Sequence, residues 1–125
     1  MLNMLAVALG AAIGANLRYG ITLWATQRFG PLFPYGTLLI NLLGCLSIGV
    51  LLTLASNRLS MSEPMRLLLV TGLLGGFTTF SSFGYETYVM IQEGRWQAAA
   101  LYVVISVLLG LLAVFIGAAL VKMSG

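Results

Sequence analysis

The stretch GLLGGFTTFSSFGYE (72–86) holds the densest set of side chains suited to ion chemistry in this chain: hydroxyls, aromatics and the carboxylate of Glu86. Phe77, Phe80 and Phe83 recur every three residues, so in a helix they would drift along one face. A phenyl ring has an electropositive edge, and ring edges combined with hydroxyl donors can hold a small anion without a fixed positive charge. A fixed charge would trap the ion, whereas conduction needs a site weak enough to release it. The alternative is an ordinary packing or lipid-facing stripe.

The same stretch is poorly suited to a continuous helix. Each of its four glycines weakens a helix by roughly 1 kcal/mol relative to Ala. Its Thr and Ser hydroxyls compete for nearby backbone carbonyls, so we expect a break near residues 75–80. Carbonyls freed inside a membrane are tolerated only where protein buries them or where they line a cavity, and transporters use such breaks to bind cations. The alternative is a continuous helix with close glycine packing.

Polar side chains at helical spacing recur in two other apolar segments. Thr37 and Asn41 are four residues apart and so share a helix face, and the Asn amide offers two N–H donors. Tyr102, Ser106 and Gly110 form a similar row, small and hydroxyl-bearing, near the C-terminus. These rows are candidates to line an ion route, and hydrogen bonding between helices is the alternative role.

Two charged side chains fall within apolar segments. Arg18 would cost at least about 2.5 kcal/mol at the bilayer centre, so we expect it to face a cavity or to snorkel to the surface. Glu86 is the only carboxylate in an apolar segment. It could pair with a hydroxyl or an Arg, cap the helix after the break, or stand at a pore mouth. Further candidates for the ion route are Arg18, Thr37, Ser81 and Glu86.

The elements that must position these residues are membrane-spanning helices. The chain is 60% hydrophobic and only 7% charged, with a mean hydropathy of +1.04, whereas soluble domains carry roughly 25% charged residues. It has no His and one Cys, Cys45, which excludes His-based catalysis and an intrachain disulfide. We expect no enzyme here. Scattered basic residues and a net charge of +3 give no nucleic-acid patch.

Apolar runs long enough to cross a bilayer, about 20 residues each, occur four times. The sequence therefore predicts an all-α membrane protein, one four-helix transmembrane domain over residues 1–125 with its third helix broken. The expected spans are 4–26, 35–56, 65–91 and 97–121.

The basic residues are balanced between the two ends of these spans. One end carries Arg58, Arg66 and Lys122, and the other carries Arg28 and Arg95 with Arg18 nearer to it. The positive-inside rule needs an excess on one side. We therefore expect insertion in both orientations, with noise in a small count as the alternative.

Pairs of small residues four apart allow close helix contact. They occur at Gly10/Gly14, Gly72/Gly76 and Ala113/Gly117. Four short helices also enclose little of a pore alone. An antiparallel homodimer would account for the small residues, the incomplete pore and the balanced charge together.

Three segments carry a resemblance to a known family. GAAIGANLRYG (10–20), YGTLLINLLG (35–44) and GLLGGFTTFSSFGYE (72–86) resemble the signatures of the bacterial fluoride channels, the Fluc or CrcB family. The similarity covers the whole chain in length and span count, and the third segment is the most specific. It implies a fluoride-selective channel that passively exports fluoride from the cytoplasm. It also implies a dual-topology antiparallel homodimer with two pores, in the bacterial inner membrane.

The resemblance also assigns residues. It implies that Phe80 and Phe83 line the fluoride path by their ring edges, with Asn41 nearby as a donor. It implies that backbone carbonyls of Gly75 and Thr78 from both subunits hold one central sodium ion, Na+, that is structural and not transported.

The fourth span fits the family pattern in part. Tyr102 and Ser106 match its polar row as further pore residues, but Gly110 and Val114 stand where a hydroxyl is often found. This difference leaves open how far the polar row extends.

Two other classes compete with the channel. A small dual-topology multidrug or cation exporter has similar size, but it uses a carboxylate in the first span, and here only Glu86, in the third, could serve. A structural subunit without transport would leave the broken span unexplained. Export needs no ATP, because a negative-inside potential drives anions outward by about 2.3 kcal/mol per charge per 100 mV. No Gly-x4-Gly-Lys-Ser/Thr motif is present.

Overall fold

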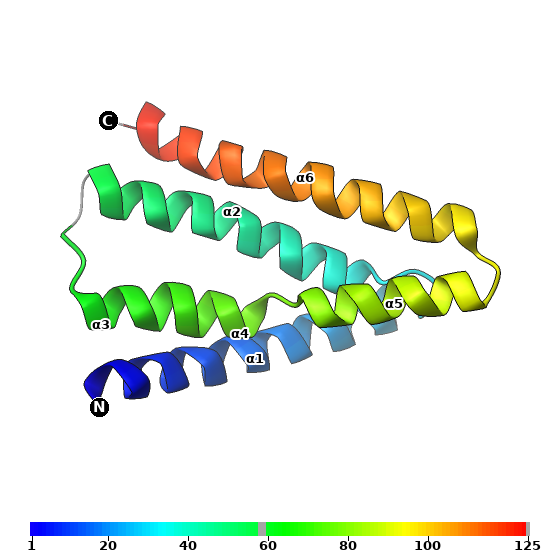
Figure 1. Ribbon diagram of the computed structural model, residues 1–125, viewed down its shortest axis with the longest axis horizontal. Coiled ribbons are helices and arrows are strands. Elements are labelled where there is room, and N and C mark those ends of the chain that lie inside the picture. Colours follow the sequence, from blue (N-terminus) through cyan, green and yellow to red (C-terminus); the bar gives the residue numbers. More distant parts are fainter. Residues whose placement is uncertain (58–59, 125) are drawn as a thin grey trace.

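The computed structural model describes residues 1–57 and 60–124, and every regular element in these ranges is helical (Figure 1). Of the residues discussed above, Arg58 lies outside the described residues, so its contribution to the charge balance has no structural counterpart. The elements in chain order are α1 (Leu2–Phe29), α2 (Tyr35–Asn57), α3 (Glu63–Arg66), η1 (Leu67–Leu74), α4 (Gly75–Phe77), α5 (Phe80–Gln92) and α6 (Trp96–Met123).

Four rods of helix lie side by side, and α3, η1, α4 and α5 together form the third (Figure 1). The N-terminus and the C-terminal end of α6 lie at the same end of the bundle as the end of α2 and the start of α3 (Figure 1). The connections between α1 and α2 and between α5 and α6 lie at the other, the loop end. Four helices in the described residues are long and apolar enough to cross a membrane: Leu2–Phe29, Tyr35–Asn57, Glu63–Gln92 and Trp96–Met123. The prediction of four helices of membrane-spanning length and composition is confirmed.

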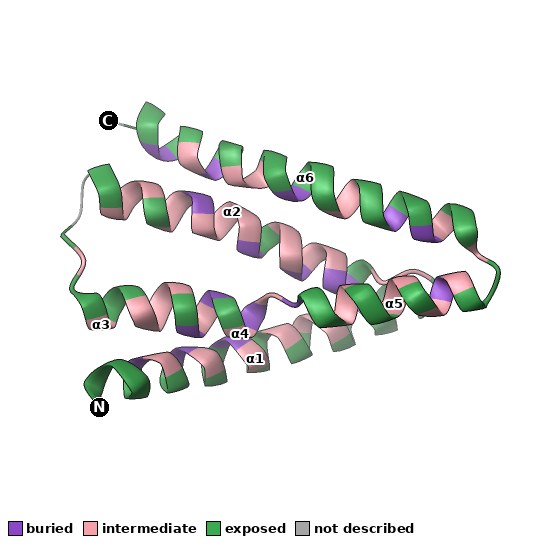
Figure 2. Ribbon diagram, viewed as in Figure 1, coloured by how far each residue is buried: buried purple, intermediate pink, exposed green. Residues whose placement is uncertain are grey.

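Large apolar side chains cover the outside of the bundle. Leu108 and Phe115 on α6 are exposed, as are Leu9 and Ile13 on α1, and exposed residues run along the outer faces in Figure 2. The buried positions of these two helices are mostly Ala and Gly. This distribution suits a bundle whose solvent is lipid, because lipid gives apolar side chains no reason to turn inward.

Glycines seat the first half of the third rod directly on α1. A Cβ on Gly72 would lie 2.7 Å from the carbonyl oxygen of Val7, and one on Gly76 would lie 2.5 Å from that of Ala11. A Cβ on Gly14 would overlap the carbonyl oxygen of Leu73. The backbones of the two helices are therefore in contact, and any larger residue would separate them.

A second glycine contact joins α2 to α6. A Cβ on Gly49 would meet the carbonyl of Val114, and one on Gly117 would meet that of Leu46. All three predicted pairs of small residues thus include positions that pack within one chain. These pairs therefore give no support to a homodimer.

The third rod is interrupted where the sequence predicts a break. Thr78 (φ −82°, ψ 157°) and Thr79 (φ −150°, ψ 115°) are extended between α4 and α5. The eight residues of η1, which precede α4, form a π-helix. This wider helical turn often occurs at functional sites. Thr79 caps α5 by accepting a hydrogen bond from Ser82 N at 3.2 Å. The helix after the break is therefore capped by Thr79 and not by Glu86.

Candidate functional site

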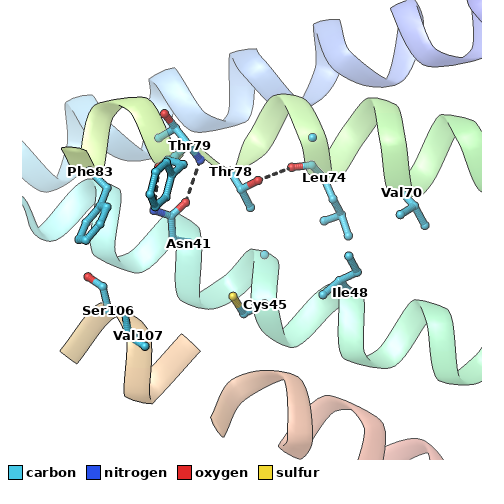
Figure 3. A pocket seen from close by; sticks show the side chains of 13 residues that line it. Asn41, Cys45, Ile48, Val70, Leu74, Thr78, Thr79, Phe83, Ser106 and Val107 are labelled. Atoms are coloured by element: carbon cyan, nitrogen blue, oxygen red, sulfur yellow. Dashed lines mark hydrogen bonds between the residues drawn. The ribbon is translucent and has the colours of Figure 1, made fainter. Parts of the chain in front are cut away.

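A groove of about 420 Å³ lies beside the break, between α2, the third rod and α6. Figure 3 shows it from close by, with Asn41 pointing to the break and Ser106 pointing toward Phe83. Six of the residues predicted from the sequence line it: Asn41, Gly75, Thr78, Phe80, Phe83 and Ser106.

Asn41 holds the extended segment in place. Its Nδ2 donates to the carbonyl of Thr79 at 3.0 Å, and its Oδ1 accepts from the amide of Thr79 at 2.8 Å. The side-chain amide thus replaces both backbone partners that the break removes from this residue. An Asn amide has two N–H donors, and this pairing uses one, so a second is left for a ligand.

Two carbonyls at the break lose their helical donors. Gly75 O would accept from the amide of Thr79 in a continuous helix, but that amide donates to Asn41. Thr78 O would accept from the amide of Ser82, which donates instead to Thr79 Oγ1. These two carbonyls are the ones to which the resemblance assigns sodium. The described residues contain no cluster of His, Cys, Asp or Glu suited to a metal, so a cation here would depend on carbonyl oxygens.

The three phenylalanines do not form a single stripe. Phe77 is buried before the break, whereas Phe80 after it is 83% exposed, because the two extended residues between them change the direction in which the helix faces. Phe80 and Phe83 remain together, with ring centroids 5.6 Å apart, and Phe83 is 5.1 Å from the ring of Tyr102. The expected pair of ring edges is therefore Phe80 and Phe83, without Phe77.

A hydrogen-bonded triad adjoins the groove. Glu86 accepts from Thr37 Oγ1 at 2.7 Å and from the Tyr102 hydroxyl at 2.8 Å. Thr37 and Tyr102 are both buried. Of the roles expected for Glu86, hydroxyl pairing is the one observed. Tyr102 also connects the two sites, because its ring contacts Phe83 while its hydroxyl binds Glu86.

Arg18 and Ser81 lie apart from the groove lining. Arg18 is partly exposed on α1, and within the described residues its side chain has no ion-pair or hydrogen-bond partner. Ser81 is exposed, with its Oγ 3.4 Å from Thr79 Oγ1. The side chains of Arg18 and Ser81 are therefore accessible to a ligand, lipid or partner outside the chain.

Sequence reasoning missed the importance of Thr79 and Phe33. Thr79 binds Asn41 through its backbone and caps α5, and the preference of helix N-caps for Thr is the signal that could have identified it. The ring of Phe33 packs edge-on against Tyr102, 5.4 Å away. No local sequence pattern predicts that contact, because Phe33 lies in the connection between α1 and α2.

Together, the fold and the site define a class: a small multi-pass membrane protein whose broken span borders a groove of aromatic, amide and hydroxyl groups. Residues 5–118 match the family described as CrcB-like protein, Camphor Resistance (CrcB). The chain belongs to this family.

Curated relatives are similar to this chain over nearly its whole length. The chain is 66% identical over 125 residues to "Fluoride-specific ion channel FluC" of Chloroflexus aurantiacus, covering 100% of this chain and 99% of the relative. It is 56% identical over 121 residues to the protein of the same name in Roseiflexus sp., covering 97% and 98%. It is 45% identical over 120 residues to that of Agrobacterium fabrum, covering 96% of each.

Proposed function

We propose that this protein is a fluoride-selective ion channel that passively exports fluoride from the cytoplasm. The observation that carries the proposal is the groove, where Asn41, Phe80, Phe83 and Ser106 gather at the break in a chain 66% identical to a protein named as a fluoride channel. Its family is one of channels and not of enzymes. A drug exporter working through Glu86 has no support from these relatives.

The groove supplies weak donors and no fixed charge. Phe80 and Phe83 offer ring edges, Ser106 a hydroxyl, and Asn41 its second N–H. No Lys or Arg is among the lining residues. Several weak donors can replace part of the hydration shell of fluoride and still release it, which is the condition for conduction.

A second copy of the chain would complete the pore. Phe80 is 83% exposed and Gly75 is exposed, although the resemblance places both at functional positions. A neighbour packed on this face would cover them. We propose that this neighbour is an antiparallel copy of the same chain, so that each of two pores takes its wall from both subunits.

The distribution of aromatic residues supports two orientations. All Trp and Tyr residues of the chain lie in the half of the bundle nearer the loop end: Tyr19, Trp24, Tyr35, Tyr85, Tyr88, Trp96 and Tyr102. Trp and Tyr are enriched at both surfaces of a membrane, but one chain supplies them toward only one. Two antiparallel copies in a bacterial inner membrane would place an aromatic belt at each surface.

We further propose that sodium binds at the break. Gly75 and Thr78 would each contribute a backbone carbonyl from both copies. Oxygen ligands without a carboxylate suit a monovalent cation better than calcium or magnesium. Its role would be structural, because it would satisfy carbonyls that lipid cannot.

Fluoride efflux from liposomes tests the channel function. Purified protein reconstituted into vesicles loaded with equal fluoride and chloride is expected to release fluoride, read by an ion-selective electrode, and to retain chloride. Equal release of both ions would refute selectivity. Proton-coupled uptake of a cationic drug would instead favour the exporter.

Labelling of the C-terminus tests dual topology. A tag placed after Gly125, which lies outside the described residues, is expected to be accessible from both sides of the membrane. Access from one side alone would contradict the antiparallel arrangement. Lys residues added to the connection between α2 and α3 should fix one orientation, and flux should fall until an oppositely biased copy is co-expressed.

Replacement of sodium tests the cation site. A bulky organic cation on both sides should lower fluoride current, while the reversal potential stays set by fluoride alone. If the current is indifferent to the cation, no structural ion binds. If the reversal potential follows sodium, the ion is transported and the structural role is wrong.

A further inference from the structure

Two hollows flank Glu86 at the loop end of the bundle. The first, about 160 Å³, is lined by Thr22, Thr26 and Thr37 together with Glu86. The second, about 260 Å³, is lined mostly by apolar residues together with Glu86, Glu93 and Arg95. We call them the threonine hollow and the arginine hollow.

The connection between α1 and α2 borders both hollows. Pro31 and Pro34 line each of them, so the 30–34 segment lies between the hollows as a strap. Gly30, at φ +81°, allows the chain to leave α1 in this direction. The strap also reaches the triad, since its Phe33 packs against the ring of Tyr102.

Arg95 ties this strap to the neighbouring connection between α5 and α6. Its guanidinium donates from Nη2 to the carbonyl of Leu32 and from Nη1 to Glu93 Oε2 at 3.3 Å. The bond to Leu32 joins residues 63 positions apart. Arg95 is thereby placed to hold the strap against the turn between α5 and α6.

A continuous series of contacts leads from the groove to the threonine hollow. Phe83 lines the groove and packs against Tyr102, Tyr102 binds Glu86, and Glu86 and Thr37 line the hollow. One water needs only about 10–15 Å³ of such space, so the hollow has room for an ion of similar size with water around it. The hydroxyls of Thr22 and Thr26 offer donors on its wall, whereas the hydroxyl of Thr37 already donates to Glu86.

Building on the proposed function, we propose that fluoride passes between the triad and the water at the loop end through the threonine hollow. In this proposal Arg95 is a positioning residue, which sets the width of the hollow by holding the 30–34 strap. The arginine hollow is the competing exit. Its lining is mainly apolar, and its Glu93 carboxylate and Arg95 guanidinium pair with each other at 3.3 Å, so neither offers an unpaired charge or donor to a passing anion.

Cysteine modification distinguishes the two exits. Thr26→Cys and Val89→Cys each place one thiol in one hollow, and Gln97→Cys places one at the same end in neither. Each variant is treated in detergent with a negatively charged methanethiosulfonate, checked by mass spectrometry, and reconstituted. All variants carry Cys45→Ala, because Cys45 lines the groove, and the Cys45→Ala parent is treated in parallel.

Modified Thr26→Cys is expected to lose most of its fluoride efflux relative to the unmodified variant, whereas modified Gln97→Cys and the treated parent keep theirs. Full modification of Thr26→Cys with unchanged efflux would overturn the exit. Loss of efflux at Val89→Cys alone would assign the exit to the arginine hollow and overturn it as well. Failure of every unmodified protein to carry fluoride would refute the proposed function itself.

A second measurement tests Arg95. In the Thr26→Cys protein, Arg95→Gln is expected to raise the rate of thiol modification several-fold, because a released strap opens the hollow. Glu93→Gln removes the ion pair but keeps the bond to Leu32, so it should leave the rate unchanged, and Arg95→Lys should restore part of the closure. Equal rates in all four proteins would show that Arg95 does not position the strap. The retention volume in size-exclusion chromatography confirms that each variant is folded.

Discussion

The two halves of the third rod meet the same bundle in different ways. Before the break, Gly72 and Gly76 bring the backbone of η1 and α4 into contact with α1. After the break, α5 is held by side chains. The amide of Asn41 binds Thr79, the N-cap residue of α5, and Glu86 binds Thr37 and Tyr102. Gly84, in this second half, has no atom within 4 Å of where its Cβ would be.

The first half of the rod therefore anchors the span, and the second half carries the side chains that can contact an ion. Backbone contact fixes position and leaves no polar side chain free, because carbonyls and glycines fill the space between the helices. Side-chain contact is looser but keeps hydroxyls, an amide and ring edges beside a groove. The break lets one span do both, since the first half can be fixed while the second presents donors.

The largest expected effect is on the anchored half. Gly76→Val should abolish most folded protein, because its side chain would force α1 and α4 apart, at a cost of about 1–3 kcal/mol or more. Gly84→Val, in the second half, should remain folded. Yield and thermal stability by fluorescence-detected size-exclusion chromatography measure both. Equal losses in the two variants would contradict the contrast between the halves.

Asn41→Ala should weaken both stability and fluoride efflux. It leaves the amide of Thr79 without its acceptor, an unsatisfied group that costs about 1–3 kcal/mol. Asn16→Ala is the matched control, because that amide is exposed and donates only within its own helix, to Ala12 O at 2.8 Å. A thermal unfolding curve for Asn41→Ala that coincides with the control would show that Asn41 does not hold the break.

Phe80→Ile and Phe83→Ile should keep the fold and sharply lower fluoride efflux. Both changes roughly keep side-chain volume while removing the electropositive ring edge. Phe115→Ile, on the lipid-exposed face of α6, is the control and should leave efflux intact. Unchanged efflux in both test variants would return these rings to a packing role.

The smallest effect is expected for Tyr102→Phe. It keeps the ring contacts with Phe33 and Phe83 but removes one donor to Glu86, a hydrogen bond worth about 0.5–1.5 kcal/mol. Efflux should fall less than in Phe83→Ile. Tyr88→Phe, at an exposed position on α5, is the control. A loss as large as that of Phe83→Ile would place the main barrier at the triad and not at the groove.

Local composition was enough to predict the four spans and the break. Runs of about 20 apolar residues specify membrane helices by length alone. Glycines and hydroxyls near residues 75–80 weaken the helix wherever it sits. The residues that line the groove could also be predicted, but only through the resemblance to a family. Spacing alone left a packing role open for Phe80 and Phe83.

Only the tertiary structure decided which groups meet. Asn41 binds Thr79 across 38 residues, and Glu86 binds Thr37 across 49. Neither pairing is a property of a local segment, because both depend on how α2 lies against α5.

The pairs of small residues could likewise be predicted only in part from the sequence. Their spacing predicts close helix contact, but only the packing of the bundle places Gly72 and Gly76 against α1 of the same chain.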